Sequence, residues 1–146
     1  MSHLEDFCKT LSQLSDTVKT ISDIEQSRVQ AAAAKQHSKI QDFANEEQAA
    51  ILSLRGLEQR RQHQAESLGW KGLTFRQILE VADAEQKKVL LPRFTELDER
   101  VSLLKEIRKS ADRIMGVRIR ELEDAIAISG GTPGGAAGHH FHDRYV

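Results

Sequence analysis

Cysteine, proline and aromatic residues are all scarce in this chain of 146 residues. Cys8 is the only cysteine, so no intramolecular disulfide can form, as is usual for proteins of a reducing compartment. The two prolines leave long stretches free to be helical. Aromatic residues make up 5% of the chain. Stability must therefore come from aliphatic side chains along elongated helices rather than from a thick aromatic core.

Long hydrophobic runs and strong net charge are missing too. No stretch approaches the roughly 20 consecutive apolar residues of a membrane span, and the N-terminus lacks the pattern of a signal peptide. The net charge is −1, and the basic residues Lys105, Lys109 and Arg113 are interleaved with acidic ones. We expect a cytoplasmic protein that has no membrane span and binds no nucleic acid.

The chain offers little material for a metal centre. Its one cluster of metal-binding residue types, His139, His140, His142 and Asp143, lies in a glycine-rich tail, where the ligands would form only an open and weak site. The Glu-x-x-His pairs of a di-iron helical bundle are absent, because His63 precedes Glu66 and the reversed pattern has no second copy. We expect solvated histidines and no metal.

Motifs of catalysis are equally hard to find. Neither a phosphate-binding glycine loop nor a nucleophile motif precedes any predicted helix. Glu46 and Glu47 are adjacent carboxylates, but neighbouring helix positions point about 100° apart and cannot act as a pair. We interpret both as part of a solvated helix face. The sequence predicts a protein that is not an enzyme and that needs no cofactor.

What the chain does contain is three stretches in which apolar residues recur at alternating steps of three and four. Such spacing forms a narrow seam on a helix, of the kind buried by neighbouring helices in coiled-coil-like packing. It predicts an all-α fold, an antiparallel bundle of three long helices with a short capping helix between the second and third. The seams are Leu4, Phe7, Leu11, Leu14, Val18, Ile21; Ile40, Phe43, Ile51, Leu54, Leu57; and Phe94, Leu97, Val101, Leu104, Ile107, Ala111, Ile114, resuming at Leu122 and Ile126.

Local signals place the breaks in the first half of this pattern. Helix one is expected over 3–34 and helix two over 39–68, with a turn near 34–38. Ser38 and Gln41 have the spacing of a capping box that would open helix two. Gly69 is the residue expected just past its end. The rival interpretation is one uninterrupted helix of more than about 60 residues, which the usual lengths of helices disfavour.

Similar signals divide the second half. Thr74 and Gln77 form a second capping-box pattern, which opens a short helix over 75–82 that we expect to cap the open end of the helical hairpin. Helix three is expected from Ala84 or Gln86 to Ile128, and Pro92 either begins its long part or kinks it. These boundaries give a helical bundle domain over 1–128 and a flexible glycine-rich tail over 129–146.

Two glycines stand inside predicted helices. Each of Gly56 and Gly116 costs roughly 1 kcal/mol relative to alanine in a helix interior, so a packing reason is expected. One explanation is a close approach of two helices. The other is a shallow groove that receives a helix of a partner protein.

The segment from the second long helix into the short one resembles the FlgN-type flagellar export chaperones. An E-E-Q start at Glu46–Gln48 is followed by an L-x-x-L-E-x-x-R middle at Leu54–Arg61 and by L-G-x-x-G-x-T-x-x-x-I-L at Leu68–Leu79. The order of the helices, their lengths and the position of the loop extend the resemblance to Leu4–Ile128.

The resemblance implies a non-enzymatic cytoplasmic chaperone of the flagellar type III export system. Such proteins hold hook-associated filament-junction proteins and deliver them to the export apparatus. Subunits of this kind have amphipathic helical ends, which an exposed seam can receive by helix-in-groove packing.

We expect the partner surface on the last part of the third helix and on the tail. Its predicted residues are Gly116, Ile119, Leu122, Ile126, Phe141 and Tyr145. The alternative is a structural or regulatory coiled-coil protein that self-associates through its seams. The chaperone interpretation allows a monomer or a weak homodimer.

Overall fold

The chain is all-helical over the part that its computed structural model describes, residues 2–115, with side-chain surroundings described for 2–110. Four helices follow one another, α1 (His3–Ala33), α2 (His37–Ser67), α3 (Phe75–Val81) and α4 (Ala84–Met115), and no strand occurs among these residues. The all-α prediction is confirmed. The predicted boundary between bundle and tail at 128/129 lies outside the described residues.

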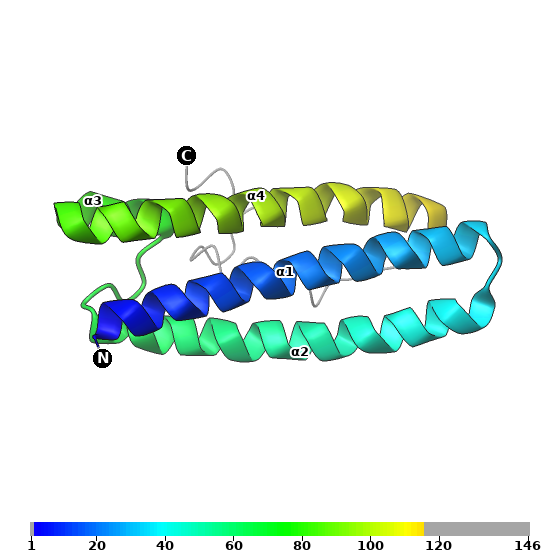
Figure 1. Ribbon diagram of the computed structural model, residues 1–146, viewed down its shortest axis with the longest axis horizontal. Coiled ribbons are helices and arrows are strands. Elements are labelled where there is room, and N and C mark those ends of the chain that lie inside the picture. The colour runs from blue at the N-terminus through cyan, green and yellow to red at the C-terminus, as the bar shows by residue number, and fades with distance from the viewer. Residues whose placement is uncertain (1, 116–146) are drawn as a thin grey trace.

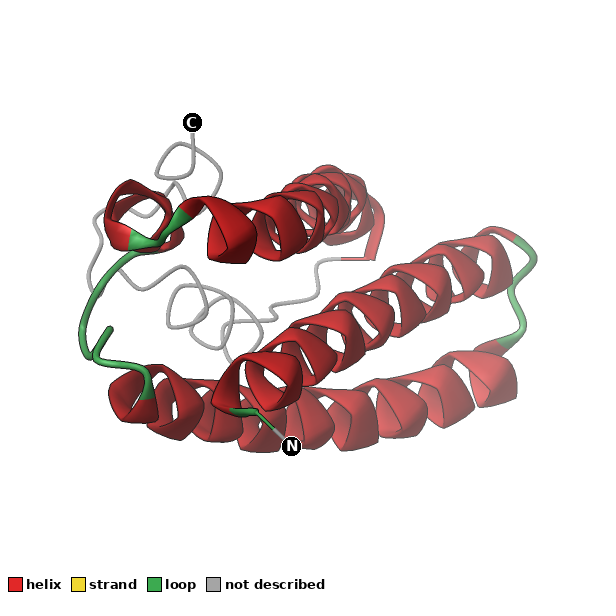
Figure 2. Cartoon of the chain, turned by 60° about the vertical axis from the view of Figure 1, so that its left-hand side comes forward, coloured by secondary structure: helices red, strands yellow, loops and turns green. Residues whose placement is uncertain are grey.

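The three long helices lie side by side, with α1 between α2 and α4 (Figures 1 and 2). α2 returns antiparallel to α1, and α4 runs in the same direction as α1. α1 packs along both neighbours, whereas α2 and α4 have hardly any direct contact over the described residues. Below, the end of the molecule that holds the N-terminus and α3 is called the proximal end. The end that holds the α1–α2 turn is called the distal end.

Reciprocal side-chain caps begin three of the helices. Ser2 Oγ accepts the backbone N–H of Glu5 at 3.0 Å, and Thr74 Oγ1 accepts that of Gln77 at 3.1 Å. The second of these boxes was predicted. A third box opens α4, where Asp83 and Gln86 exchange bonds of 2.8 and 2.9 Å. Each box satisfies two backbone donors that the first turn of a helix leaves without partners.

The turn between α1 and α2 was predicted, but its predicted cap is wrong. Gln36 precedes α2 and makes no side-chain capping bond, and Ser38 already lies inside the helix. Backbone bonds close the turn instead. Lys35 adopts φ 57°, and Gln36 N–H donates to the carbonyl of Ala31 at 2.9 Å. This is a Schellman ending of α1, in which lysine takes the left-handed position usually held by glycine.

α2 ends as predicted, at a glycine. Gly69 has φ 83°, and the N–H of Trp70 returns to the carbonyl of Ala65 at 2.8 Å. The bond directs the chain back toward the helices, and Trp70 is buried. Glycine is favoured at this φ because a Cβ would be strained there.

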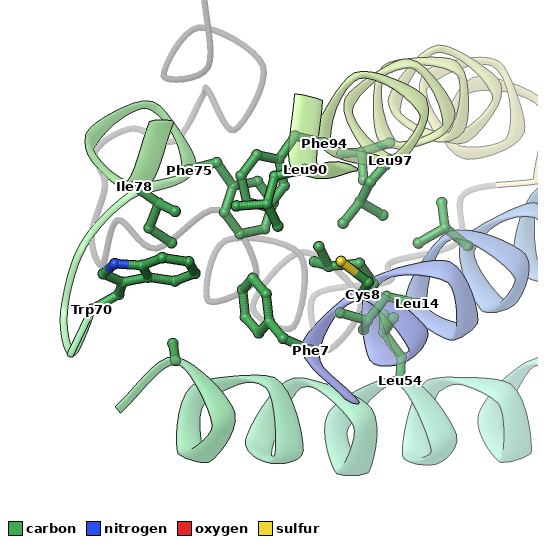
Figure 3. Packing of buried hydrophobic residues seen from close by; sticks show 14 of the residues in the cluster. Phe7, Cys8, Leu14, Leu54, Trp70, Phe75, Ile78, Leu90, Phe94 and Leu97 are labelled. Atoms are coloured by element: carbon green, nitrogen blue, oxygen red, sulfur yellow. The ribbon is translucent and has the colours of Figure 1, made fainter. Parts of the chain in front are cut away.

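Aromatic rings concentrate the core at the proximal end (Figure 3). Phe75 of α3 stacks on Phe94 of α4 with ring centroids 4.1 Å apart. Phe7 of α1 meets Trp70 edge-on at 5.8 Å. Ile78, one turn beyond Phe75, is also fully buried. α3 therefore contributes Phe75 and Ile78 to the core at this end.

Pro92 and Gly56, two residues that disfavour helix, both lie inside helices of the structure. α4 runs continuously from Ala84 to Met115 with Pro92 inside it, so this proline neither starts nor ends the helix. Gly56 is exposed, and a Cβ built on it would meet nothing within 4 Å. The close approach of helices proposed for Gly56 is therefore wrong, and nothing in the structure explains a glycine there. Gly116 lies outside the described residues.

Candidate functional site

Charged residues continue the seams where the apolar residues stop. On α1 the alternating steps run past Ile21 to Glu25 and Arg28, and both side chains are buried. On α2 the same spacing includes Glu47, Glu58 and Arg61, which are also buried. Ionised side chains are rarely this buried unless they are paired. These five residues are the strongest candidates for a functional site, and they form two clusters.

In the proximal cluster, formed by Glu58 and Arg61, both carboxylate oxygens accept hydrogen bonds. Arg61 donates from Nε and Nη2 to the two carboxylate oxygens of Glu58, each at 2.7 Å. Gln62 adds a bond of 3.1 Å to Glu58 Oε2. The guanidinium also lies over the ring of Phe75, with Cζ 5.2 Å from its centroid. A bidentate pair that stacks on an aromatic ring has the geometry for which arginine is best suited.

The distal cluster, formed by Glu25, Arg28 and Glu47, joins α1 to α2. A single nitrogen of Arg28, Nη1, donates to Glu25 Oε1 on its own helix at 3.2 Å and to Glu47 Oε1 on α2. Two buried atoms of Arg28 and Glu47, Nε and Oε2 respectively, and Oγ of the neighbouring Ser22 have no hydrogen-bond partner among the described residues. A buried polar atom left unpaired costs about 1–3 kcal/mol. This cluster is therefore incompletely satisfied.

The two glutamates of α2 are comparable positions on one helix face. Glu47 and Glu58 are 11 residues apart, which is about three turns and leaves them only about 20° apart around the axis. Both are buried. They differ in bonding, because both oxygens of Glu58 accept bonds whereas Glu47 uses one.

The surroundings of the two clusters also differ. The main hydrophobic cluster ends at Ile21 on α1 and at Ile51 on α2, and two further apolar residues of α1, Ile24 and Ala31, are buried beyond it. Between His37 and Ala50, Glu47 is the only buried residue, and Ile40 and Phe43 are half-buried. The distal end of the hairpin therefore buries fewer apolar side chains than the proximal end and buries charged ones beside them.

Polar contacts also join α1 to α4. Ser15 Oγ donates to Glu96 Oε1 at 3.1 Å, and Arg100 Nη1 donates to Asp16 Oδ1 at 3.1 Å. Arg100 lies 3.6 Å from Glu96 as well. These partly exposed groups align the two helices in parallel register. Exposed pairs of this kind contribute little to stability, typically about 0–1 kcal/mol.

Cys8 lies in the proximal core and does not form part of either cluster. Its side chain is buried, as expected from its place beside Phe7. Burial raises the pKa of the Cys8 thiol, and the positive charge of Arg93 opposes that rise. A thiol with a raised pKa is mostly protonated at neutral pH and is a poor nucleophile.

The structure corrects one prediction about carboxylates and leaves the predicted partner surface untested. Glu46 is exposed, as expected, but Glu47 is not part of a solvated face, because Arg28 reaches it across the helix pair. The residues predicted to bind partners lie outside the described residues: Gly116, Ile119, Leu122, Ile126, Phe141 and Tyr145. So do the tail residues His139, His140, His142 and Asp143.

The sequence carries a signal for the two charged clusters that the apolar spacing alone does not reveal. The steps of three and four on α1 do not end at Ile21, since Glu25 and Arg28 occupy the next two seam positions. Charged residues at seam positions indicate buried ion pairs whenever opposite charges occur on the facing helix.

No helix of the described part is long and apolar enough to cross a membrane. Within the same residues, no group of three or more histidine, cysteine or acidic side chains could hold a metal ion. Comparison of the chain with protein-family models, with curated proteins and with solved structures finds no match.

Proposed function

We propose that the chain is a cytoplasmic export chaperone of the flagellar type III secretion system. It binds hook-associated proteins through helix-in-groove contacts and delivers them to the export apparatus. The motifs of Glu46–Gln48, Leu54–Arg61 and Leu68–Leu79 support this assignment through their resemblance to the FlgN-type chaperones. The proposal includes the antiparallel arrangement of three long helices with α3 as the capping helix.

One structural observation carries the proposal. α2 and α4 both pack along α1 and hardly touch each other over the described residues (Figure 2). Two long helices seated on a third without packing on each other form an arrangement that a further amphipathic helix can complete. Axial subunits with amphipathic helical ends are partners of the required shape. The proposed role needs no catalytic residue and no cofactor.

Binding to purified hook-associated proteins tests the proposal. Each protein is titrated into the full-length chain by isothermal titration calorimetry, and the complex is weighed by light scattering. We expect one of them to form a stable complex with the chain as a monomer or weak dimer. Absence of binding to every hook-associated protein contradicts the proposal. An obligate dimer that binds none of them favours the self-associating coiled-coil protein.

A full-length double variant tests the predicted partner residues after α4. Replacing Leu122 and Ile126 by lysine should weaken partner binding by roughly tenfold or more, as loss of apolar anchors does. The melting temperature should change little. Leu52→Lys is the matched control, because Leu52 is exposed on α2. Unchanged binding together with a large loss of stability would place Leu122 and Ile126 in the core instead.

A further inference from the structure

Glu47 stands out as a hydrogen-bond acceptor that is buried and only half used. Its Oε1 shares Arg28 Nη1 with Glu25, and its Oε2 has no hydrogen-bond partner among the described residues. Glu58, three turns along the same face of α2, shows how such a carboxylate is satisfied when a guanidinium offers two nitrogens. Glu47 lacks the second donor.

The part of the hairpin around Glu47 is suited to local opening. Ile40, Phe43 and Ala44 are half-buried and lie outside the hydrophobic core of the described residues. Segments with few buried apolar contacts open at lower free energy than the core does. A helix entering here would find apolar side chains to cover and a carboxylate oxygen to bond.

The chemistry of this site selects among possible helices. A donor that reached Glu47 Oε2 would remove the cost of an unpaired buried acceptor, and a cationic donor would form the stronger, charge-assisted bond. Arginine is the best candidate, because its guanidinium is weakly hydrated and bonds carboxylates in a fixed plane. A helix that is wholly apolar on its binding face would leave the oxygen unpaired.

From these observations we infer that the distal end of the α1–α2 hairpin binds an amphipathic helix of the exported partner that carries one arginine within its apolar stripe. The arginine pairs with Glu47 beside Arg28, and the apolar residues of the same stripe cover Ile40 and Phe43. The inference rests on the proposed function, since it places part of the partner contact on a defined surface.

A pair of synthetic helical peptides tests this arrangement on the full-length chain. Both carry leucine at steps of three and four and glutamine on the outer face. At the central stripe position one carries arginine and the other citrulline, which has nearly the same shape without the charge. Binding is measured by fluorescence anisotropy. We expect the arginine peptide to bind roughly tenfold more tightly, as a charge-assisted bond to a buried carboxylate would give.

Variants of the chain show which residue causes the preference for the arginine peptide. Glu47→Gln should reduce it to near unity, whereas Glu46→Gln, which removes the same charge at the exposed neighbouring position, should leave it intact. Circular dichroism checks that each variant is folded. If Glu47→Gln does not fold, Glu47→Asp keeps the charge on a shorter side chain and should retain a reduced preference.

Several outcomes overturn the inference. They are equal affinity for the two peptides, no binding of either, and a preference that survives Glu47→Gln. A chain dimer that Glu47→Gln dissolves would assign the site to a second copy. A full-length Arg118→Gln, Arg120→Gln variant that gains affinity for the arginine peptide would assign it to the segment after α4. If hook-associated proteins bind but the two peptides bind alike, the proposed function stands and this inference fails.

Discussion

The two ends of the helical hairpin are built on the same seam spacing but with different chemistry. At the proximal end most seam positions hold aromatic and aliphatic side chains, and Phe7, Phe75 and Phe94 form a dense cluster (Figure 3) beside the bidentate pair of Glu58 and Arg61. At the distal end the equivalent positions hold Glu25 and Arg28, with Glu47 facing them. One spacing therefore produces a mainly apolar core at one end and a core with a larger share of charged groups at the other.

The difference shows that a buried side chain at a seam position does not always stabilise the fold. Burying apolar area stabilises a fold in rough proportion to that area. A buried ion pair gains attraction but loses hydration, so its net contribution is small even though removing one partner is costly. The proximal end should accordingly hold the fold together, while the distal end specifies how α1 and α2 align.

The largest expected effect comes from truncating the aromatic core at the proximal end. Phe75→Ala should lower the free energy of unfolding by about 3–5 kcal/mol, because it empties a fully buried site. Phe43→Ala at the half-buried distal position should cost less than half as much. Urea denaturation followed by circular dichroism measures both. Equal losses would break the distinction between the two ends.

A smaller effect separates the two carboxylates of α2. Glu58→Gln should cost about 2–3 kcal/mol, because it disrupts a bidentate pair and leaves Arg61 buried without its full partner. Glu47→Gln should cost about 1 kcal/mol, since Arg28 keeps Glu25 and one oxygen of Glu47 made no bond. Thermal unfolding of both variants at neutral pH measures the difference. The reverse order would show that the distal cluster is the better satisfied one.

Helix capping provides a third and smaller comparison. Thr74→Ala should lower stability by about 1 kcal/mol, because Thr74 caps the helix that covers the proximal end. Ser38→Ala should change stability by less than about 0.5 kcal/mol, since Ser38 lies within α2 and makes no capping bond. Urea midpoints of the two variants test this. A comparable loss at Ser38 would indicate that it caps α2 in solution.

The smallest effect is expected at the N-terminus of α1. Hydrogen bonds from the backbone and side chain of Ser2 lower the pKa of Glu5. A carboxyl whose pKa is lower in the folded state adds stability above its unfolded pKa and loses it as the pH falls through the folded value. Glu5→Gln should therefore lower stability slightly near pH 7, where the ionised carboxyl contributes, and flatten the acid limb of the stability–pH curve, whereas Glu5→Asp keeps a titrating carboxyl. A steeper acid limb in Glu5→Gln would contradict the assignment.

Local features of the fold followed from the sequence because they depend on neighbours along the chain. The cap at Thr74 and the helix end at Gly69 use atoms within about five residues, and both were predicted. The cap expected at Ser38 failed for the same local reason, since backbone bonds of the Lys35 turn begin α2 two residues earlier. The apolar seams indicated which helix faces are buried in the proximal half.

The sequence by itself determined that the described chain is helical, where its main turns lie, and which apolar residues form the proximal core. Only the tertiary structure decided that Glu47 and Glu58 are buried, and that one is saturated while the other is not. The physical reason is that hydration and pairing of a charge depend on atoms brought near it by other helices. Arg28 reaches Glu47 across 19 positions of sequence, a contact that no local pattern contains.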